Sequence, residues 1–288
     1  MREGGSLDVP ASAPPGPRDP RDPQGLPPEI NAGTAHSARV YDYWLGGKDN
    51  FAADRALGDA IIAAVPTTRF AARANRSFLG RAVRYLAAEA GVTQFLDIGT
   101  GIPTAGNTHE VAQAAVPRAR VVYVDHDPIV LAHARALMTS SPAGATAFIK
   151  ADLRDPGKIL ADPELRKTLD LGRPVALMLI AVLHFLTEQE NPRGLVAELL
   201  DALPSGSYLT IAHLTADFNQ EEAATALAAS RQSSITYVPR TAAEVAAFFD
   251  GLDLVDPGVV PLLTWRPDDG APQDPLAARM YAAMGRKP

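Results

Sequence analysis

The sequence predicts an α/β protein with a doubly wound, mostly parallel sheet, an antiparallel edge and an N-terminal helical cap. Short, unbroken apolar runs recur along the chain, and helical stretches separate them. Strands that are buried on both faces have such runs, and their alternation with helices indicates right-handed crossovers in a parallel sheet. A chain of 288 residues is long enough for one large domain of this kind.

The predicted elements follow one another in regular order after residue 92. Two late apolar runs, near Leu254–Leu262 and Arg279–Met284, are expected to form the antiparallel edge. The parallel strands are predicted at Gln94–Ile98, Arg120–Val124, Ala147–Ile149, Val175–Ile180 and Tyr208–Ala212. Helices are predicted after Pro103 and over Pro128–Met138, Gly194–Leu203, Asn219–Ser230 and Ala242–Phe249.

The chain before these elements divides into a tail and a cap. From Met1 to about Glu29 the sequence is rich in proline, glycine and charged residues and has almost nothing apolar to bury. Such a composition predicts disorder. We therefore divide the chain into a disordered tail, residues 1–30, an N-terminal helical cap, residues 31–91, and a core, residues 92–288.

The cap is predicted to contain two helices behind an aromatic segment that begins near Ala38. The first helix is expected around Ala53–Ala64, and the second begins after Pro66 and ends at Gly91. The second helix is amphipathic, since apolar residues recur at four-residue spacing on the face opposite its arginines. Its apolar positions are Phe70, Ala74, Phe78, Ala82 and Leu86, and its arginines are Arg69, Arg73, Arg76 and Arg84.

Composition limits the classes of partner. Hydrophobic residues make up 47% of the chain and charged residues 21%, as in ordinary globular proteins. Basic residues number 27 and acidic residues 33, with no basic cluster, so no nucleic-acid partner is expected. No cysteine is present, which excludes disulfides and thiolate metal sites. Without a signal pattern or an apolar run of roughly 18 residues, no membrane partner is expected and the predicted location is cytoplasmic.

The strongest local signal is the segment FLDIGTGIP, in which a strand runs into a glycine turn. Gly99 and Gly101 let the backbone approach a ligand closely, and the turn is expected to lead to a helix N-terminus. A plain strand-to-helix turn is the alternative interpretation. Asp97 lies beside this turn, where a carboxylate would repel a pyrophosphate but attract a cationic ligand.

Further acids follow the next two predicted strands. Asp125 ends the second strand 24 positions after Gly101, close to the spacing of an acid that holds ribose hydroxyls. Asp125 could instead cap the next helix, but Asp127, next to Pro128, is better placed for that role. Asp152 follows the third strand. These acids are expected to converge at the switch point where open α/β sheets bind ligands.

The order of these motifs resembles that of class I S-adenosylmethionine-dependent methyltransferases, which have a Rossmann-like fold. The segment ARVYDYWLGGKDNF, residues 38–51, resembles the opening signature of a bacterial methyltransferase family catalogued as a domain of unknown function. The resemblance implies S-adenosylmethionine as the cofactor and a small molecule as the substrate, which it does not identify. It also implies that Asp97, Gly99 and Gly101 surround the methionine part, Asp125 binds the ribose, and Asp152 with Leu153 flanks the adenine.

The sequence departs from the methyltransferase pattern at Pro103, where many of these enzymes have a third glycine. A proline suits the first turn of a helix, so we expect altered fine geometry but the same fold. Two alternatives stay open at this stage. One is an NAD(P)-dependent oxidoreductase, because a glycine turn followed by Asp125 also suits a nicotinamide cofactor. The other is a noncatalytic protein that binds S-adenosylmethionine.

His184 is the candidate catalytic residue, since it follows the fourth predicted strand and resembles the base of some small-molecule O-methyltransferases. A packing role is the alternative. In the aromatic N-terminal segment, Tyr41, Tyr43, Asp49 and Asn50 are candidates for a cap that closes over cofactor and substrate, with a structural clasp as the alternative.

The remaining histidines do not suggest a metal site. His109, His126 and His133 are isolated, without a pattern such as His-Glu-x-x-His, and are expected at the surface or on a helix face. His213, which follows a predicted strand, is interpreted as structural, with substrate contact as the alternative. No nucleophile elbow of the type Gly-x-Ser-x-Gly is present. The oligomeric state is not predicted.

Overall fold

The protein is described here as a computed structural model. The structure describes residues 31–288 except 138, 232, 234, 269, 271 and 272. The predicted disordered tail, residues 1–30, lies outside the described residues. No helix of the described residues is long and apolar enough to cross a membrane.

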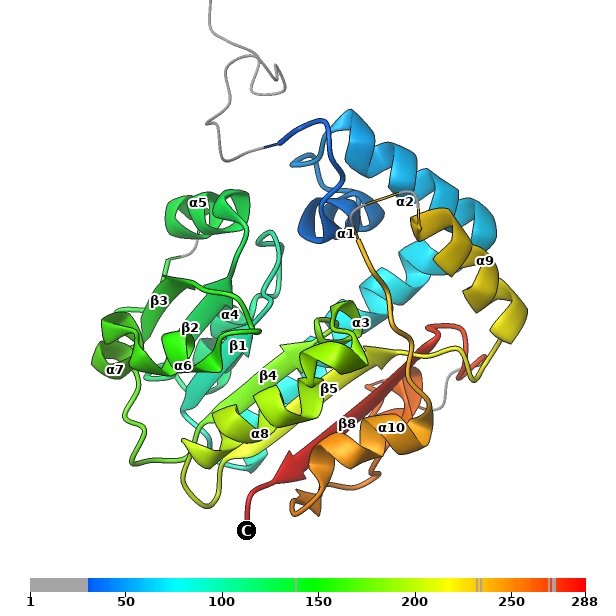
Figure 1. The fold of residues 1–288 in the computed structure, drawn as a ribbon. Coiled ribbons are helices and arrows are strands. Elements are labelled where there is room, and N and C mark those ends of the chain that lie inside the picture. The colour runs from blue at the N-terminus through cyan, green and yellow to red at the C-terminus, as the bar shows by residue number, and fades with distance from the viewer. Residues whose placement is uncertain (1–30, 138, 232, 234, 269, 271–272) are drawn as a thin grey trace, which may run out of the picture.

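The described strands form one eight-stranded sheet with the order β3-β2-β1-β4-β5-β8-β6, and β7 pairs with β8. Strands β1 to β5 are parallel, whereas β8 runs antiparallel to β5, β6 and β7 (Figure 1). The predicted fold class, including its antiparallel edge, is confirmed. The strands are β1 (Gln94–Ile98), β2 (Arg120–Asp125), β3 (Ala145–Lys150), β4 (Ala176–Ile180), β5 (Tyr208–Leu214), β6 (Asp253–Leu254), β7 (Val260–Pro261) and β8 (Met280–Arg286).

Helices cover both faces of the sheet, because the strand side chains alternate between two hydrophobic clusters. One cluster includes apolar side chains of α6, α7, α8 and α10, and the other includes those of α3 and α4 with the buried Trp265. The helices are α1 (Ser37–Leu45), α2 (Ala52–Ala64), α3 (Thr68–Arg84), α4 (Thr108–Ala115), α5 (Pro128–Leu137), α6 (Pro156–Ala161), α7 (Pro163–Thr168), α8 (Pro192–Asp201), α9 (Gln220–Ser230) and α10 (Ala242–Ala246).

The structure differs from the prediction between β1 and α4. The helix expected directly after Pro103 begins at Thr108, where Asn107 and Glu110 form a capping box. Pro103 therefore lies in a loop rather than in a first helical turn. Two short helices between β3 and β4, α6 and α7, were not predicted.

The N-terminal helices lie at the end of the sheet where the parallel strands finish, and Figure 1 shows α1 and α2 beside α9 at this end. The predicted aromatic segment forms α1. Its attachment to α2 depends on the fully buried Asp54, whose carboxylate pairs with Arg39 at 3.0 Å and accepts the backbone N–H groups of His36 and Phe51. α3 then ends in one π-helical turn (Tyr85–Glu89), and Gly91 follows with a positive φ of 72°, as predicted for a helix end.

Candidate active site

The glycine turn lies at the point where the strand order reverses, since β1 has β2 on one side and β4 on the other. Open α/β sheets bind ligands at this position. Gly99 and Gly101 have φ values of 76° and 66°, which strongly favour glycine. A Cβ on Gly99 would lie 2.5 Å from a methyl carbon of Val182, whereas a Cβ on Gly101 would meet only open space. Gly99 thus permits close packing, and Gly101 leaves room beside the turn.

Asp97 is buried at the end of β1, next to this turn. Its Oδ2 accepts a hydrogen bond of 2.6 Å from the hydroxyl of Thr108, at the start of α4. Burial raises the pKa of Asp97 to about 6, although the Thr108 bond and the charge of Arg76 act in the opposite direction. A buried carboxylate with a raised pKa favours a cationic partner, because a nearby positive charge stabilises its ionised form.

Arg76 is a site residue that sequence reasoning placed on the arginine face of its helix. The side chain instead reaches from α3 to the loop after the glycine turn, where it donates to the carbonyl oxygens of Ala105 and Gly106 and to the side chain of Asn107. Its Nε is buried and has no hydrogen-bond partner among the described residues. No local sequence pattern distinguishes Arg76 from its neighbours, because its partners come about 30 residues later.

Asp125 ends β2 as predicted and faces the same turn. Its Oδ2 accepts the backbone N–H of Gly101 at 3.0 Å, and its Oδ1 accepts that of Asp127 at 2.9 Å. Burial raises the pKa of Asp125, and these two hydrogen bonds offset part of that effect. Asp127 accepts the backbone N–H of Ile129, which confirms its predicted role as the cap of α5.

Two histidines connect Asp125 to the N-terminal segment. His36 Nδ1 lies 2.9 Å from Asp127 Oδ2, and His36 Nε2 lies 3.3 Å from His126 Nε2. His126 is half exposed and lies 3.7 Å from Asp125. His36 was not predicted as a site residue, and it lies just before the sequence signature. His109, which was expected at the surface or on a helix face, lies on α4 and is buried.

His109 is buried because the hydroxyl of Tyr123, on β2, bonds to both its backbone N–H and its Nδ1. The last of the isolated histidines, His133, lies on α5 with its Nδ1 3.5 Å from a carboxylate oxygen of Asp49. Neither contact involves the glycine turn.

A second hollow opens beyond Asp125, over the end of β3. Asp152 and Leu153 line it together with Asp125, and the two cavities share the residues around Gly99. Asp152 is partly exposed and pairs with Arg154 at 3.2 Å, whereas Leu153 is buried. Of the three acids predicted to converge, Asp125 lines both cavities, whereas Asp97 lines only the first and Asp152 only the second.

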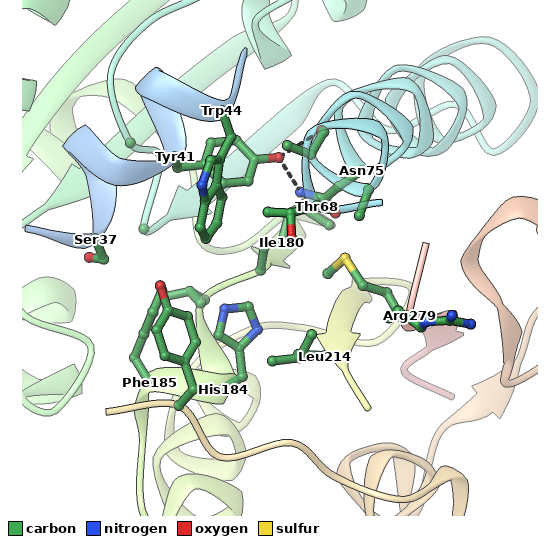
Figure 2. A pocket seen from close by; sticks show the side chains of 18 of the residues that line it. Ser37, Tyr41, Trp44, Thr68, Asn75, Ile180, His184, Phe185, Leu214 and Arg279 are labelled. Atoms are coloured by element: carbon green, nitrogen blue, oxygen red, sulfur yellow. Dashed lines mark hydrogen bonds between the residues drawn. The ribbon is translucent and has the colours of Figure 1, made fainter. Parts of the chain in front are cut away.

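The main cavity extends from the glycine turn to the N-terminal helices and has a volume of about 230 Å³. Figure 2 shows Tyr41 and Trp44, from α1, on one side and Phe185 and His184 on the other. Residues of α3 and α9 and the start of β8 complete the wall. Helices of the N-terminal segment and a helix of the later chain thus line the same space.

Of the four predicted cap residues, Tyr41 alone is among the described residues that line the cavity. Tyr43 packs on Gly58, and its hydroxyl donates to Asp59. Asp49 is exposed, and Asn50 is buried where its amide donates to a carboxylate oxygen of Asp42. Tyr43 therefore packs α1 against α2, whereas Asp49 and Asn50 lie in the turn between these helices; none of the three lines the cavity.

His184 lies in a 3-10 turn after β4, and its ring points into the cavity (Figure 2). Its Nδ1 is buried and has no hydrogen-bond partner in the described part of the chain. Burial lowers the pKa of His184 well below its ordinary value, and the neighbouring His213 and Arg240 lower it further. The imidazole is therefore neutral at neutral pH.

Arg240 fixes the backbone that carries His184. Its guanidinium is buried and donates to the carbonyl oxygens of Leu183 at 3.0 Å and Leu186 at 2.9 Å. It also donates to Nε2 of His213, whose Nδ1 bonds to the carbonyl oxygen of Leu214. His213 thus has partners on both nitrogens, and burial lowers its pKa to about 4, as expected of a structural histidine.

Fold and site together define a class: an α/β protein with a glycine turn and strand-end acids at the switch point of its sheet, beside a cavity that reaches to the N-terminal helices. The chain belongs to the S-adenosyl methyltransferase family, whose model matches residues 23–288. It is an S-adenosylmethionine-dependent methyltransferase, as the sequence predicted.

Two solved structures are similar to most of the chain. A DUF574 family protein from Streptomyces avermitilis MA-4680 is 48% identical, with a TM-score of 0.86, and the match covers 89% of this chain and 99% of that one. A protein from Thermobifida fusca YX, described as a candidate methyltransferase, is 43% identical, with a TM-score of 0.82 and coverage of 88% and 95%. Comparison with curated proteins found no match.

Proposed function

We propose that the protein transfers a methyl group from S-adenosylmethionine to a small molecule held in the main cavity. One observation carries this proposal: the glycine turn, with Asp97 and Asp125, lines the same cavity as the ring of His184. Methyl transfer requires alignment of donor and acceptor and exclusion of water, and a cavity that faces both the glycine turn and His184 supports the alignment.

The donor set suits a cofactor with a cationic amino acid part and a ribose. We assign Asp97 to the ammonium group, because its carboxylate is buried and has a raised pKa. We assign Arg76 to the carboxylate group, because its guanidinium lies at the same loop with an unpartnered Nε. Asp125 is assigned to the ribose hydroxyls. Asp152 and Leu153, in the adjoining hollow, are assigned to the adenine.

The sulfonium of the bound cofactor supplies an activated methyl group. Among the protein's own residues, we assign His184 as the base that removes a proton from the acceptor. Its ring is neutral, lines the cavity and has an unpartnered nitrogen, so it can accept that proton. Because a lowered pKa weakens a base, we expect an effect near the lower end of the usual range, about a hundredfold.

Residues 31–91 are proposed to act as a cap, and residues 38–51 are its characteristic sequence segment. Tyr41 and Trp44 support this role because both side chains line the cavity. Deletion of residues 1–29 should leave cofactor binding unchanged, since their composition offers little to pack. Deletion through Phe51 removes α1 and should abolish binding; a folded, normally binding product would contradict the cap.

Isothermal titration calorimetry tests the proposed function. S-adenosylmethionine and S-adenosylhomocysteine should both bind, and NAD should bind far more weakly because Asp97 lies beside the turn. Tighter binding of NAD than of either adenosyl compound would contradict the proposal. We keep the cytoplasm as the proposed location, which the lack of cysteine supports.

A further inference from the structure

The far part of the cavity indicates what kind of acceptor it holds. We propose that the acceptor is a neutral aromatic compound that carries a hydroxyl group. This inference rests on the proposed function and concerns the part of the cavity away from the glycine turn. Its wall, its charges and its unpartnered polar atoms each support one part of the proposal.

The wall is aromatic on two sides that come from distant parts of the chain. Trp44 lies on α1, whereas Phe185 and Tyr237 lie after β4 and after α9. The rings of Phe185 and Tyr237 are 5.2 Å apart, and His184 stacks on Tyr237 with ring centroids 5.9 Å apart. Flat rings on opposite walls favour a flat, apolar ligand, because aromatic surfaces gain from stacked and edge-on contacts.

Charge in this part of the cavity is balanced. Two charged side chains of the lining, Glu222 on α9 and Arg279 just before β8, face each other. Arg279 NH2 lies 2.9 Å from Glu222 Oε2, and Arg279 Nε donates to the same oxygen at 3.0 Å. A charged acceptor would have to break this pair or enter without a counterion, and both are costly. A neutral acceptor avoids that cost.

Two unpartnered polar atoms indicate a hydrogen-bond donor on the ligand. The amide N–H of Asn75 donates to the hydroxyl oxygen of Tyr41 at 2.8 Å, and that hydroxyl donates to the carbonyl oxygen of Ala72 at 3.0 Å. This chain fixes the amide orientation and leaves Asn75 Oδ1 buried without a partner among the described residues. Asn75 and His184 both line the cavity, so a hydroxyl group could satisfy either acceptor.

The size of the cavity suits a fused-ring compound. The whole cavity, from the glycine turn to the far wall, has a volume of about 230 Å³. On α9 the lining includes Ala223 and Ala226, whose short side chains leave room in this part of the cavity. We therefore choose a bicyclic phenol, 2-naphthol, as the probe.

The reaction with such an acceptor is balanced. A bond forms between the hydroxyl oxygen and the methyl carbon, while the carbon–sulfur bond breaks and its electron pair stays on sulfur. The hydroxyl proton passes to the imidazole of His184. The products are an aryl methyl ether, S-adenosylhomocysteine and one proton, which leaves for solvent.

Calorimetry on protein saturated with S-adenosylhomocysteine tests the acceptor class. At pH 7.5, 2-naphthol should bind at least about tenfold more tightly than quinoline, which has similar rings but no donor. The affinity for 2-naphthol should also exceed that for 2-naphthoate, an anion of similar shape, by at least about the same factor. Equal or tighter binding of quinoline or 2-naphthoate would overturn the proposal.

Two substitutions on α9 form a matched pair. Ala226→Phe fills the cavity and should weaken 2-naphthol binding at least about tenfold, with S-adenosylhomocysteine binding unchanged. Ala224→Phe adds the same ring on the exposed side of the helix and should change the binding of neither ligand. Unchanged 2-naphthol binding in Ala226→Phe would overturn the placement of the acceptor.

Asn75→Leu gives a second, independent measurement. It should weaken 2-naphthol about tenfold and leave quinoline binding unchanged, a difference that general loosening of the cavity would not produce. A parallel loss for both ligands would contradict the role of Asn75 Oδ1. If S-adenosylhomocysteine itself fails to bind the native protein, the proposed function is wrong. If it binds normally and 2-naphthol is not preferred, only the acceptor class is wrong.

Discussion

Asp97→Asn should make the protein more stable and weaken its binding of the cofactor. The carboxylate is 5% exposed and accepts the hydroxyl of Thr108 at 2.6 Å. Asparagine has nearly the same shape, and its amide oxygen can accept the same hydrogen bond. The substitution therefore removes a buried charge without leaving a cavity.

The size of the stability effect follows from the pKa of Asp97. Burial raises that pKa from 3.8 to about 6, so between these values the folded state holds a proton that the unfolded state has released. Stability consequently falls as pH rises through this window. At about 1.4 kcal/mol per pKa unit, ionised Asp97 costs roughly 3 kcal/mol at neutral pH. Asp97→Asn removes this cost, and the melting temperature should rise by roughly 6–12 °C.

Cofactor binding should change in the opposite direction. A bound ammonium group favours ionised Asp97, so the affinity of the native protein for S-adenosylmethionine should fall as pH drops through about 6. The loss of a hydrogen bond to a charged group should weaken binding by about 10–100-fold at pH 7.5. The affinity of the variant should vary little over this pH range.

Melting curves and calorimetric titrations between pH 5 and pH 8 measure both effects. Thr108→Val serves as a second variant, because the Thr108 bond lowers the pKa of Asp97 and its loss should move the midpoint of cofactor binding to higher pH. An Asp97→Asn protein that binds S-adenosylmethionine as tightly as the native protein would refute the assignment of Asp97. A lower melting temperature would refute the calculated cost of its burial.

Three further predictions concern single residues. Asp125→Ala removes the proposed ribose acceptor and should cost about 1–3 kcal/mol of cofactor binding by calorimetry; unchanged affinity would contradict the assignment. His184→Ala should lower kcat at least about a hundredfold with little change in cofactor affinity. Turnover of this variant within a few-fold of the native rate would show that His184 has a structural role. Because burial and the neighbouring His213 and Arg240 lower the pKa of His184, the acid limb of the native kcat profile should lie well below pH 6.5. Asp54→Ala leaves Arg39 buried and unpaired and should cost about 3–5 kcal/mol of unfolding free energy in denaturant titrations, and a loss below about 1 kcal/mol would contradict the role of this pair.

Much of the fold follows from periodicity in the sequence. β1 has the predicted bounds because Gln94–Ile98 is a short apolar run that ends in a glycine turn. The strand-end acids were also predictable, since parallel strands finish at the same edge of a sheet. The unpredicted helices α6 and α7 had a local signal, because Asp155 and Asp162 each precede a proline and cap the next helix.

Contacts between remote segments could not be predicted in this way. Arg76 has the spacing of a solvent-facing arginine on α3, and only the fold brings the loop at Gly106 against it. His36 lies in a segment of little periodicity and meets His126 across 90 residues. Tyr43 and Trp44 are adjacent in sequence, but the helical turn directs Trp44 alone of the two toward the cavity.

The enclosure of the cavity by α1 to α3 and by α9 has a consequence for engineering. α2 contacts α9, and Ile235, Phe185 and Tyr237 pack in one cluster with Val40 and Leu57. A graft of the N-terminal helices from a relative would place foreign side chains against a native α9. The contact surface between the two would then be poorly packed. Acceptor preference should therefore transfer between relatives as a two-part unit, residues 36–79 together with residues 219–239, and chimeras that exchange one part should lose stability before they gain a new substrate.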